Sequence, residues 1–415
     1  MKKITKVAFL FILLISLFSG CRTANKPQAD SKVSSESETG MAAKEPESTN
    51  SNSDDDLPEL SLTGQLSEDI AQLCELEKDR GTAVEAHDID GESAIISFWS
   101  KESQSNFASY SYILSEKQGL TYLQEFGLAG DQEGWKFTLG GVQGYSRTEQ
   151  TINVFSWQDR QRMDQEKIVG PEEILQSCNP SFWYTYTDDF KKRAVIKGNT
   201  EITEKIELVI ENLEDGSKTV EMTLGEDVPI GALWNLDDIY FLNSNQLLYT
   251  GLSWEGEGKQ PERVYGIMDL ESQQNSSIYK RDVALYSETG CIMLVDGNQA
   301  IRMGKATDTV LLFQRENEEW ISFSFPKTEK VQMGIGVSRS GKYLMVSYYD
   351  RETESSEGRV FETATGEQVA TVDMNLENKG EKSVSNFCIL EDQEQLVYFG
   401  ADGTTEIINF GRNEK

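Results

Sequence analysis

The sequence predicts an all-β fold, a single β-propeller of seven four-stranded blades over residues 57–415, following a disordered N-terminal tether. From about Leu57 onward, short runs rich in Val, Ile, Tyr, Phe, Trp and Thr alternate with clusters of Gly, Asp, Asn and Ser. Such runs indicate short strands separated by turns. The runs also repeat with a period of roughly 50 residues, which favours a propeller over a sandwich or a barrel.

The N-terminus has the composition of an export signal. Three lysines precede the apolar stretch Val7–Phe18, which is too short to span a bilayer, and small residues follow it. The ending Phe18, Ser19, Gly20, Cys21 resembles the lipobox of bacterial lipoproteins. The resemblance implies that residues 1–20 are a lipoprotein signal peptide and that Cys21 is lipidated and carries palmitate. The alternative is an ordinary secretory signal with a chance cysteine.

Residues 21–56 are predicted to be a disordered polar linker. They are mostly Ser, Glu, Asp, Asn, Lys and Ala, with almost no large apolar side chain to offset the entropy of ordering. A flexible chain of this length has a typical reach of roughly 30–35 Å. We therefore expect a protein held at the cell membrane by its lipid, on the exported face, which is extracellular or periplasmic.

Two interpretations compete for the start of the folded part. Leu60–Thr63 is a candidate fourth strand for the last blade, which would pair the two ends of the ring and remove a sheet edge. Ser67–Arg80 instead has apolar residues at helical spacing and is followed by Gly81, which indicates a short amphipathic helix.

The clearest blades lie in Val337–Val372 and Phe387–Phe410. Each has a turn before its second strand, and Asp402 and Gly403 predict a hairpin with a type I′ turn. These units resemble divergent bacterial members of the WD40-like propeller superfamily, although Phe361 and Glu362 stand where the family has Trp and Asp. The second strands of the seven copies are placed near Ile95, Tyr145, Ala194, Leu247, Ile292, Tyr343 and Leu396.

Composition excludes several functions. The chain has 39 Lys and Arg against 70 Asp and Glu, a net charge of −31, which excludes a general nucleic-acid binder. His87 is the single histidine, so a zinc site with two His ligands is excluded. No Gly-x-Ser-x-Gly motif is present, which excludes a propeller-linked serine peptidase. We expect no metal and no cofactor, and we expect His87 to pack or hydrogen-bond beside Asp88. The segment Asp88–Gly91 is interpreted as a β turn rather than a calcium loop.

The remaining candidate residues are acidic pairs, tryptophans and cysteines. Asp237 with Asp238, and Asp188 with Asp189, are the candidate acid pairs for a propeller glycosidase. Trp254, in a polar, glycine-rich segment, is a possible ligand or partner contact. The other tryptophans are expected to pack between blades: Trp99, Trp135, Trp157, Trp183, Trp234 and Trp320. The cysteines beyond Cys21 are expected to be buried thiols, with disulfides left open: Cys74, Cys178, Cys291 and Cys388.

Together these features predict a non-catalytic binding or scaffold module at the cell envelope, with no catalytic residues. Its partner would be an envelope protein, a peptide or a glycan, and the membrane itself would be contacted through the lipid. Two alternatives stay open. One is a carbohydrate-active enzyme, a glycoside hydrolase or lyase, that uses two carboxylates. The other is an envelope protein-assembly factor.

Overall fold

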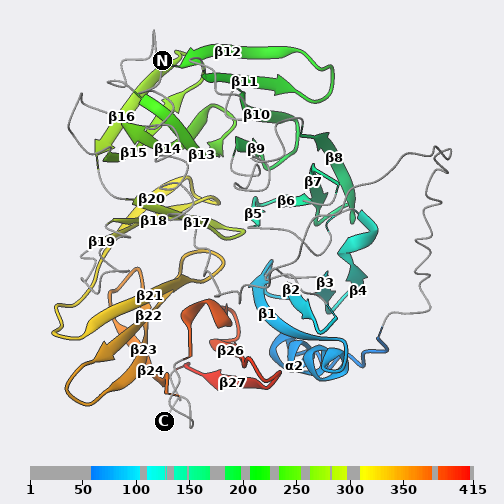
Figure 1. Ribbon diagram of the computed structural model, residues 1–415, viewed down its shortest axis with the longest axis vertical. Coiled ribbons are helices and arrows are strands. Elements are labelled where there is room, and N and C mark those ends of the chain that lie inside the picture. Colours follow the sequence, from blue (N-terminus) through cyan, green and yellow to red (C-terminus); the bar gives the residue numbers. More distant parts are fainter. Residues whose placement is uncertain are drawn as a thin grey trace, which may run out of the picture. The chain divides into compact units, whose positions relative to one another are not determined.

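A computed structural model of the chain describes residues 58–102, 110–126, 128, 135–146, 149–168, 183–197, 206–224, 233–253, 262–280, 283–296, 309–375 and 382–411. Within these residues, seven antiparallel sheets surround a common axis (Figure 1). Six sheets have four strands and the last has three. The all-β, seven-bladed propeller expected from the sequence is thus confirmed.

Each blade is built from consecutive strands, beginning with the strand nearest the axis. Blades 1 and 2 contain β1 (Gly81–Asp88), β2 (Ser93–Ser100), β3 (Tyr110–Ser115), β4 (Gly119–Tyr122), β5 (Lys136–Phe137), β6 (Gly141–Ser146), β7 (Thr151–Ser156) and β8 (Gln161–Lys167). Blades 3 and 4 contain β9 (Tyr184–Tyr186), β10 (Lys192–Lys197), β11 (Ile206–Asn212), β12 (Lys218–Leu224), β13 (Leu233–Asn243), β14 (Gln246–Ser253), β15 (Glu262–Asp269) and β16 (Gln274–Lys280). Blades 5 to 7 contain β17 (Val283–Ser287), β18 (Cys291–Asp296), β19 (Thr309–Gln314), β20 (Glu319–Ser324), β21 (Val331–Val337), β22 (Tyr343–Asp350), β23 (Ser355–Glu362), β24 (Gln368–Asp373), β25 (Phe387–Leu390), β26 (Gln395–Phe399) and β27 (Thr405–Asn409).

Every predicted second-strand position falls on the second strand of its blade, from Ile95 in β2 to Leu396 in β26. These strands read as continuous apolar runs because neighbouring blades cover both of their faces. All six residues of β6 and of β7 are buried, whereas most of the outer strand β8 is exposed. The apolar run that repeats in the sequence therefore marks the middle of each blade.

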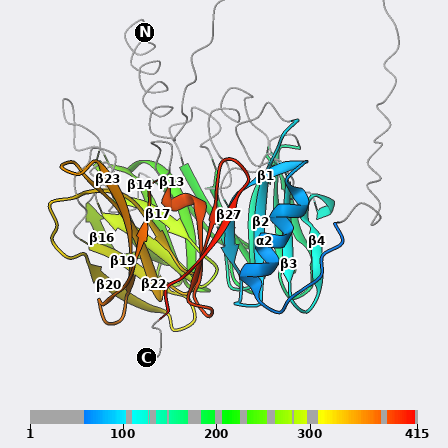
Figure 2. The same ribbon diagram turned by 90° about the horizontal axis from the view of Figure 1, so that it is seen from below.

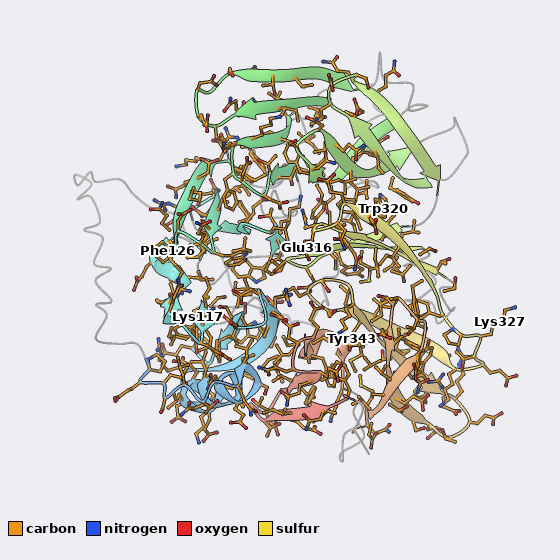
Figure 3. The ribbon with its side chains drawn as sticks, turned by 180° about the vertical axis from the view of Figure 1, so that it is seen from behind. Lys117, Phe126, Glu316, Trp320, Lys327 and Tyr343 are labelled. Carbon is orange, nitrogen blue, oxygen red and sulfur yellow. The ribbon has the colours of Figure 1, made fainter. Side chains whose placement is uncertain are left out.

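The hydrophobic core lies between adjacent blades rather than at the axis. One cluster joins Leu208 of blade 3 to Phe241 of blade 4, and another joins Leu312 of blade 5 to Phe361 of blade 6. Figure 3 shows side chains filling the spaces between sheets all around the ring. Blades 2 to 6 thus each contribute apolar side chains to the clusters on both of their faces.

The hairpin between β26 and β27 is confirmed, but its turn differs from the predicted one. Gly403 has a positive φ of 84° and Asp402 does not, so the loop is not a type I′ turn. The amide of Gly400 donates to the carbonyl of Thr404, and the amide of Gly403 donates to the carbonyl of Gly400. The loop is longer than two residues, and only the glycine needs the left-handed conformation.

The predicted closing strand at Leu60–Thr63 is wrong, because these residues are not in a strand. The competing prediction is confirmed: α2 (Leu66–Glu77) is a helix, and it contacts β26 and β27 of the last blade and β1, β2 and β3 of the first. Figure 2 shows α2 in front of the strands of the first blade, with β27 to one side. The ring therefore closes through a wedged helix and not through a shared sheet.

Polar contacts fix α2 at both of its ends. At its start, Asp69 accepts hydrogen bonds from the amide (2.7 Å) and the hydroxyl (2.8 Å) of Thr63. At its end, the buried carboxylate of Glu77 accepts hydrogen bonds from the hydroxyls of Tyr110 (2.8 Å) and Tyr112 (3.2 Å). Two short 3₁₀ helices, η2 (Leu123–Phe126) and η4 (Val384–Asn386), complete the described elements. None of the helices in the described part of the chain is long and apolar enough to cross a bilayer.

Candidate functional site

Polar side chains from opposite sides of the ring meet at its middle, where Figure 1 shows β1, β5 and β17. The amide of Phe137 on β5 donates to the hydroxyl of Ser287 on β17, 3.4 Å away. The hydroxyl of Thr289, which follows β17, donates to the carbonyl of Asp88 on β1 at 3.4 Å. Blade 5 therefore contacts blades 1 and 2 across the axis, in addition to its neighbours in the ring.

Lys136 on β5 is a buried cation that joins blade 2 to blades 3 and 4. Its Nζ lies 2.6 Å from Oδ1 of Asp238 on β13 and donates to the carbonyls of Tyr184 (2.9 Å) and Ile239 (2.8 Å). The same ammonium lies 4.4 Å from the ring centroid of Tyr240. Burial lowers the pKa of Lys136 to about 8, against the opposing effect of Asp238.

Arg315, in the turn after β19, is a second buried cation near the axis. It donates to the carbonyl of Phe137 (2.9 Å) on blade 2 and to that of Phe241 (3.3 Å) on blade 4. Its Nη1 lies 3.6 Å from Oδ1 of Asp188, in the turn between β9 and β10. One guanidinium thus connects three other blades, in a fork geometry that lysine cannot reproduce.

His87 lies on β1, and its partner is Glu288 across the axis. Its Nδ1 is 3.1 Å from both carboxylate oxygens of Glu288, and its Nε2 is 3.9 Å from Glu85. The ring also packs on Phe137, with centroids 4.7 Å apart. Burial opposes the charged imidazolium, but the two glutamates raise the pKa of His87 to about 10, so the ring is protonated at neutral pH. The expected neighbour, Asp88, has a different partner.

That partner is Arg339, in the turn between β21 and β22. Its Nε lies 3.3 Å from Asp88, and its Nη2 lies 3.1 Å from Glu391 and 2.7 Å from Asp392, both in the turn after β25. The segment Asp88–Gly91 forms the predicted turn, in which the amide of Gly91 donates to Asp88 at 2.7 Å. Arg339 therefore connects blades 6, 7 and 1.

Three of the four candidate acids have described side chains, and each of these has a partner other than its sequence neighbour. Asp238 lies in the ion pair with Lys136, and the side chain of Asp237 lies outside the described part. Asp188 lies near Arg315 and accepts the amide of Leu139 at 2.9 Å. Asp189 instead accepts the hydroxyl of Thr187 (2.7 Å) within its own turn. Asp238 and Asp188 therefore contact cations from other blades, whereas Asp189 stabilises its own turn.

Several predicted residues lie outside the described residues: Cys21, Cys178, Trp254 and the side chain of Trp234. Cys74, Cys291 and Cys388 are buried free thiols, as expected. Trp135, Trp157 and Trp183 pack partly buried against core clusters, whereas Trp99 and Trp320 are exposed, contrary to the prediction. In the part that the structure describes, no group of three or more His, Cys, Asp and Glu side chains is placed to hold a metal ion.

Lys136, Arg315 and Arg339 were not predicted from the sequence to be functional residues. The available signal was weak: Lys136 is an isolated cation between Trp135 and Phe137, and Arg315 follows an apolar strand. A charge next to such a run is more often solvent-exposed than buried. Only the ring geometry shows that these positions face the axis.

No protein-family model and no curated protein sequence matches the chain. Among solved structures, the chain is similar to the β-propeller domain of Cps50 (Swd1) from Myceliophteria thermophila, with a TM-score of 0.47 and 11% identity over 80% of this chain and 98% of that domain. It is also similar to the β-propeller domain of the Trilobed protease from Pyrococcus furiosus, with a TM-score of 0.45 and 10% identity over 81% and 97% of the two chains. Hydrazine synthase from Kuenenia stuttgartiensis has a TM-score of 0.42 and 11% identity over 78% and 94%. Such likenesses concern the fold alone.

Proposed function

We propose that the chain is an exported, lipid-anchored β-propeller that acts as a non-catalytic binding or scaffold module at the cell envelope. The observation that carries this proposal is the use of the carboxylates near the ring axis. Asp238, Asp188 and Glu288 each face a buried or partly buried cation from another blade. A carboxylate that already holds a cation from another blade is not free to contact a substrate, as a general base must. The rigid ring would instead present its loops to a partner.

The proposed location rests on the sequence before Pro58. Residues 1–20 have the composition of a lipoprotein signal, Cys21 stands at the cleavage point, and residues 21–56 are polar enough to act as a tether. Two acyl attachments give stable anchoring, whereas one chain gives only reversible binding. We expect the mature protein to begin at Cys21 and to carry a lipid adduct. A mature mass without the adduct, or a Cys21→Ala variant that stays with the membrane fraction, would reject the anchor.

A carboxylate-dependent glycoside hydrolase or lyase is the second candidate. The test is direct: the purified protein is incubated with cell-wall and capsular glycans, and new reducing or unsaturated ends are measured. We expect no turnover. Turnover that is lost in Asp188→Asn, while the circular dichroism spectrum stays that of the wild type, would favour the enzyme and end the binding-only proposal.

The partner would be an envelope protein, a peptide or a glycan. If the partner is an envelope protein, the propeller could act as an assembly factor for it. Photo-crosslinking in intact cells, followed by mass spectrometry, identifies what lies next to the propeller. Trp254→Ala tests the proposed contact, and Trp320→Ala is the matched control, since Trp320 is 37% exposed on the outer strand β20. We expect the first variant, and not the second, to lose the crosslinked partner. Equal loss in both variants would remove Trp254 from the proposal.

A further inference from the structure

The junction between blade 7 and blade 1 has an unusual construction. In the described residues the two blades share no strand, because blade 7 ends with β27 and its neighbour begins with β1. On the face that bears the turns between first and second strands, Arg339 reaches from blade 6 to both of these blades. On this face, Arg339 and the carboxylates around it add charged contacts to the direct packing of β1 against β25.

One guanidinium faces three carboxylates there: Asp88, Glu391 and Asp392. The side chains of Asp88 and Glu391 are 1% and 4% exposed, so water screens neither charge. If all three carboxylates were ionised, the group would carry two uncompensated negative charges. Buried like charges that share one site raise the proton affinity of one member. One of the three acids should therefore hold a proton.

The geometry identifies which acid that is. Glu391 accepts three further hydrogen bonds, from the hydroxyl of Ser338 (2.7 Å) and from the hydroxyl (2.8 Å) and amide (3.1 Å) of Ser340. Asp392 is 58% exposed, so water reaches its carboxylate. Asp88 is buried and has the amide of Gly91 as its further donor. Asp88 is thus the member that takes the proton most readily.

The charges that face this group from the neighbouring elements are also known. His87, adjacent to Asp88 on β1, is held between Glu288 and Glu85. Glu288 belongs to the turn after β17, where Thr289 donates to the carbonyl of Asp88. The remaining neighbours are Arg339, Glu391 and Asp392, described above, and the buried thiol of Cys388 on β25. The only other cation among these neighbours is His87, which precedes Asp88 in the sequence and is already paired with Glu288 and Glu85.

We propose that Asp88, Arg339, Glu391 and Asp392 form a proton-controlled clasp at the place where the ring closes. The clasp is tight while Asp88 carries a proton and loosens when Asp88 ionises. The ring then opens locally between the turns that follow β1 and β25, while the rest of the propeller stays folded.

The direction of the pH dependence follows from the proton affinity of Asp88. Burial raises the pKa of Asp88 to about 7, against the opposing effect of Arg339. A carboxyl whose pKa is raised in the closed state stabilises that state fully below its ordinary pKa, and the stabilisation is lost as the pH rises through the raised value. The clasp therefore weakens between about pH 4 and pH 7 and is weakest above neutrality, which is opposite to the usual behaviour of a salt-bridged aspartate.

The first measurement uses the wild-type protein alone. Hydrogen exchange is measured at pH 5.5 and pH 8.0, and rates are corrected for intrinsic chemistry with an internal reference, the amides of β22 and β23 in blade 6. We expect the turns after β1 and β25 to lose protection relative to this reference, by about 30-fold at most if opening fully hydrates Asp88. Equal or greater relative protection at pH 8.0 would overturn the proposal.

The second measurement compares variants. Asp88→Asn removes the titrating group, and Asp392→Asn is the matched control, because it removes the exposed carboxylate on the same guanidinium. We expect the pH dependence of turn protection to disappear in Asp88→Asn and to persist in Asp392→Asn. The comparison uses the change of turn protection with pH and not the absolute stability. An Asp88→Asn protein that is less stable at every pH is therefore still informative. A slope that survives in Asp88→Asn would assign the effect to another group and refute the clasp.

Discussion

Replacing the buried Lys136 by methionine tests whether side chains at the axis hold the ring together. Methionine matches the unbranched stem of lysine as far as Cε but lacks the terminal ammonium. The ion pair with Asp238, at 2.6 Å, would be lost together with two hydrogen bonds to the carbonyls of Tyr184 and Ile239. Lys136 and Asp238 have side chains only 3% and 12% exposed, so the remaining carboxylate would stay buried without its cation. Breaking a buried pair in this way costs about 3–5 kcal/mol.

We expect the lower end of this range, near 3 kcal/mol, because Asp238 also accepts the amide of Ile239 at 2.9 Å and would keep that bond. The assay is the free energy of unfolding from urea titration at pH 6.5, where the lysine is protonated. The double variant Lys136→Met with Asp238→Asn removes the stranded charge and should recover roughly half of the loss. Lys191→Met is the control: Lys191 is 61% exposed and 3.8 Å from Glu214, and such surface pairs contribute about 0–1 kcal/mol.

The reasoning would be refuted by a loss below 1 kcal/mol in Lys136→Met, comparable to that of Lys191→Met. The pair of Lys136 and Asp238 would then add no more to the free energy of unfolding than a solvent-exposed pair does. A double variant that is less stable than Lys136→Met would refute the part of the argument that assigns the cost to the stranded carboxylate.

Three further predictions concern other parts of the ring. Since the pKa of His87 is raised to about 10, its pairing with Glu288 stabilises the fold fully below pH 6.5, and this stabilisation is lost as the pH rises to 10. The unfolding free energy of the wild type should therefore fall more steeply across pH 7–10 than that of His87→Gln. Parallel curves for the two proteins would contradict this prediction. Leu73→Ala, at a fully buried position of α2, should cost about 2–4 kcal/mol by urea unfolding, and a cost under 1 kcal/mol would mean that the wedge helix is dispensable. Gly141→Ala would place its Cβ 1.9 Å from the carbonyl oxygen of Phe155, so the soluble yield and the thermal midpoint should both drop, and a wild-type midpoint would show that the strands can separate at no cost.

The fold could be predicted from the sequence because the blade pattern is local. Apolar second strands such as the one at Leu396 repeat along the chain, and turn residues separate them. The way the ring closes could not be predicted, since Leu60–Thr63 is as compatible with a strand as the following segment is with a helix. The choice depends on the space between β27 and the first blade, which is a tertiary property.

The candidate site was much less accessible to sequence analysis. Lone charges such as Lys136 have no sequence signature, because burial at the axis depends on which blades face one another across the ring. His87 was located correctly in the first blade, but its partner Glu288 comes from blade 5, 201 positions later in the chain. Pairings over such separations leave no periodic pattern that a single sequence could reveal.

The wedge helix also constrains how the protein is made. On the ribosome α2 is synthesised among the first structured residues, whereas its docking surface on β26 and β27 is completed more than three hundred residues later. At a translation speed of roughly 5–20 residues per second, β27 is synthesised at least about 15 seconds after α2. Until then, Ile70 and Leu73 of α2 lack the part of their docking surface that the last blade supplies. The final packing of α2 is therefore complete only after the last hairpin has been made.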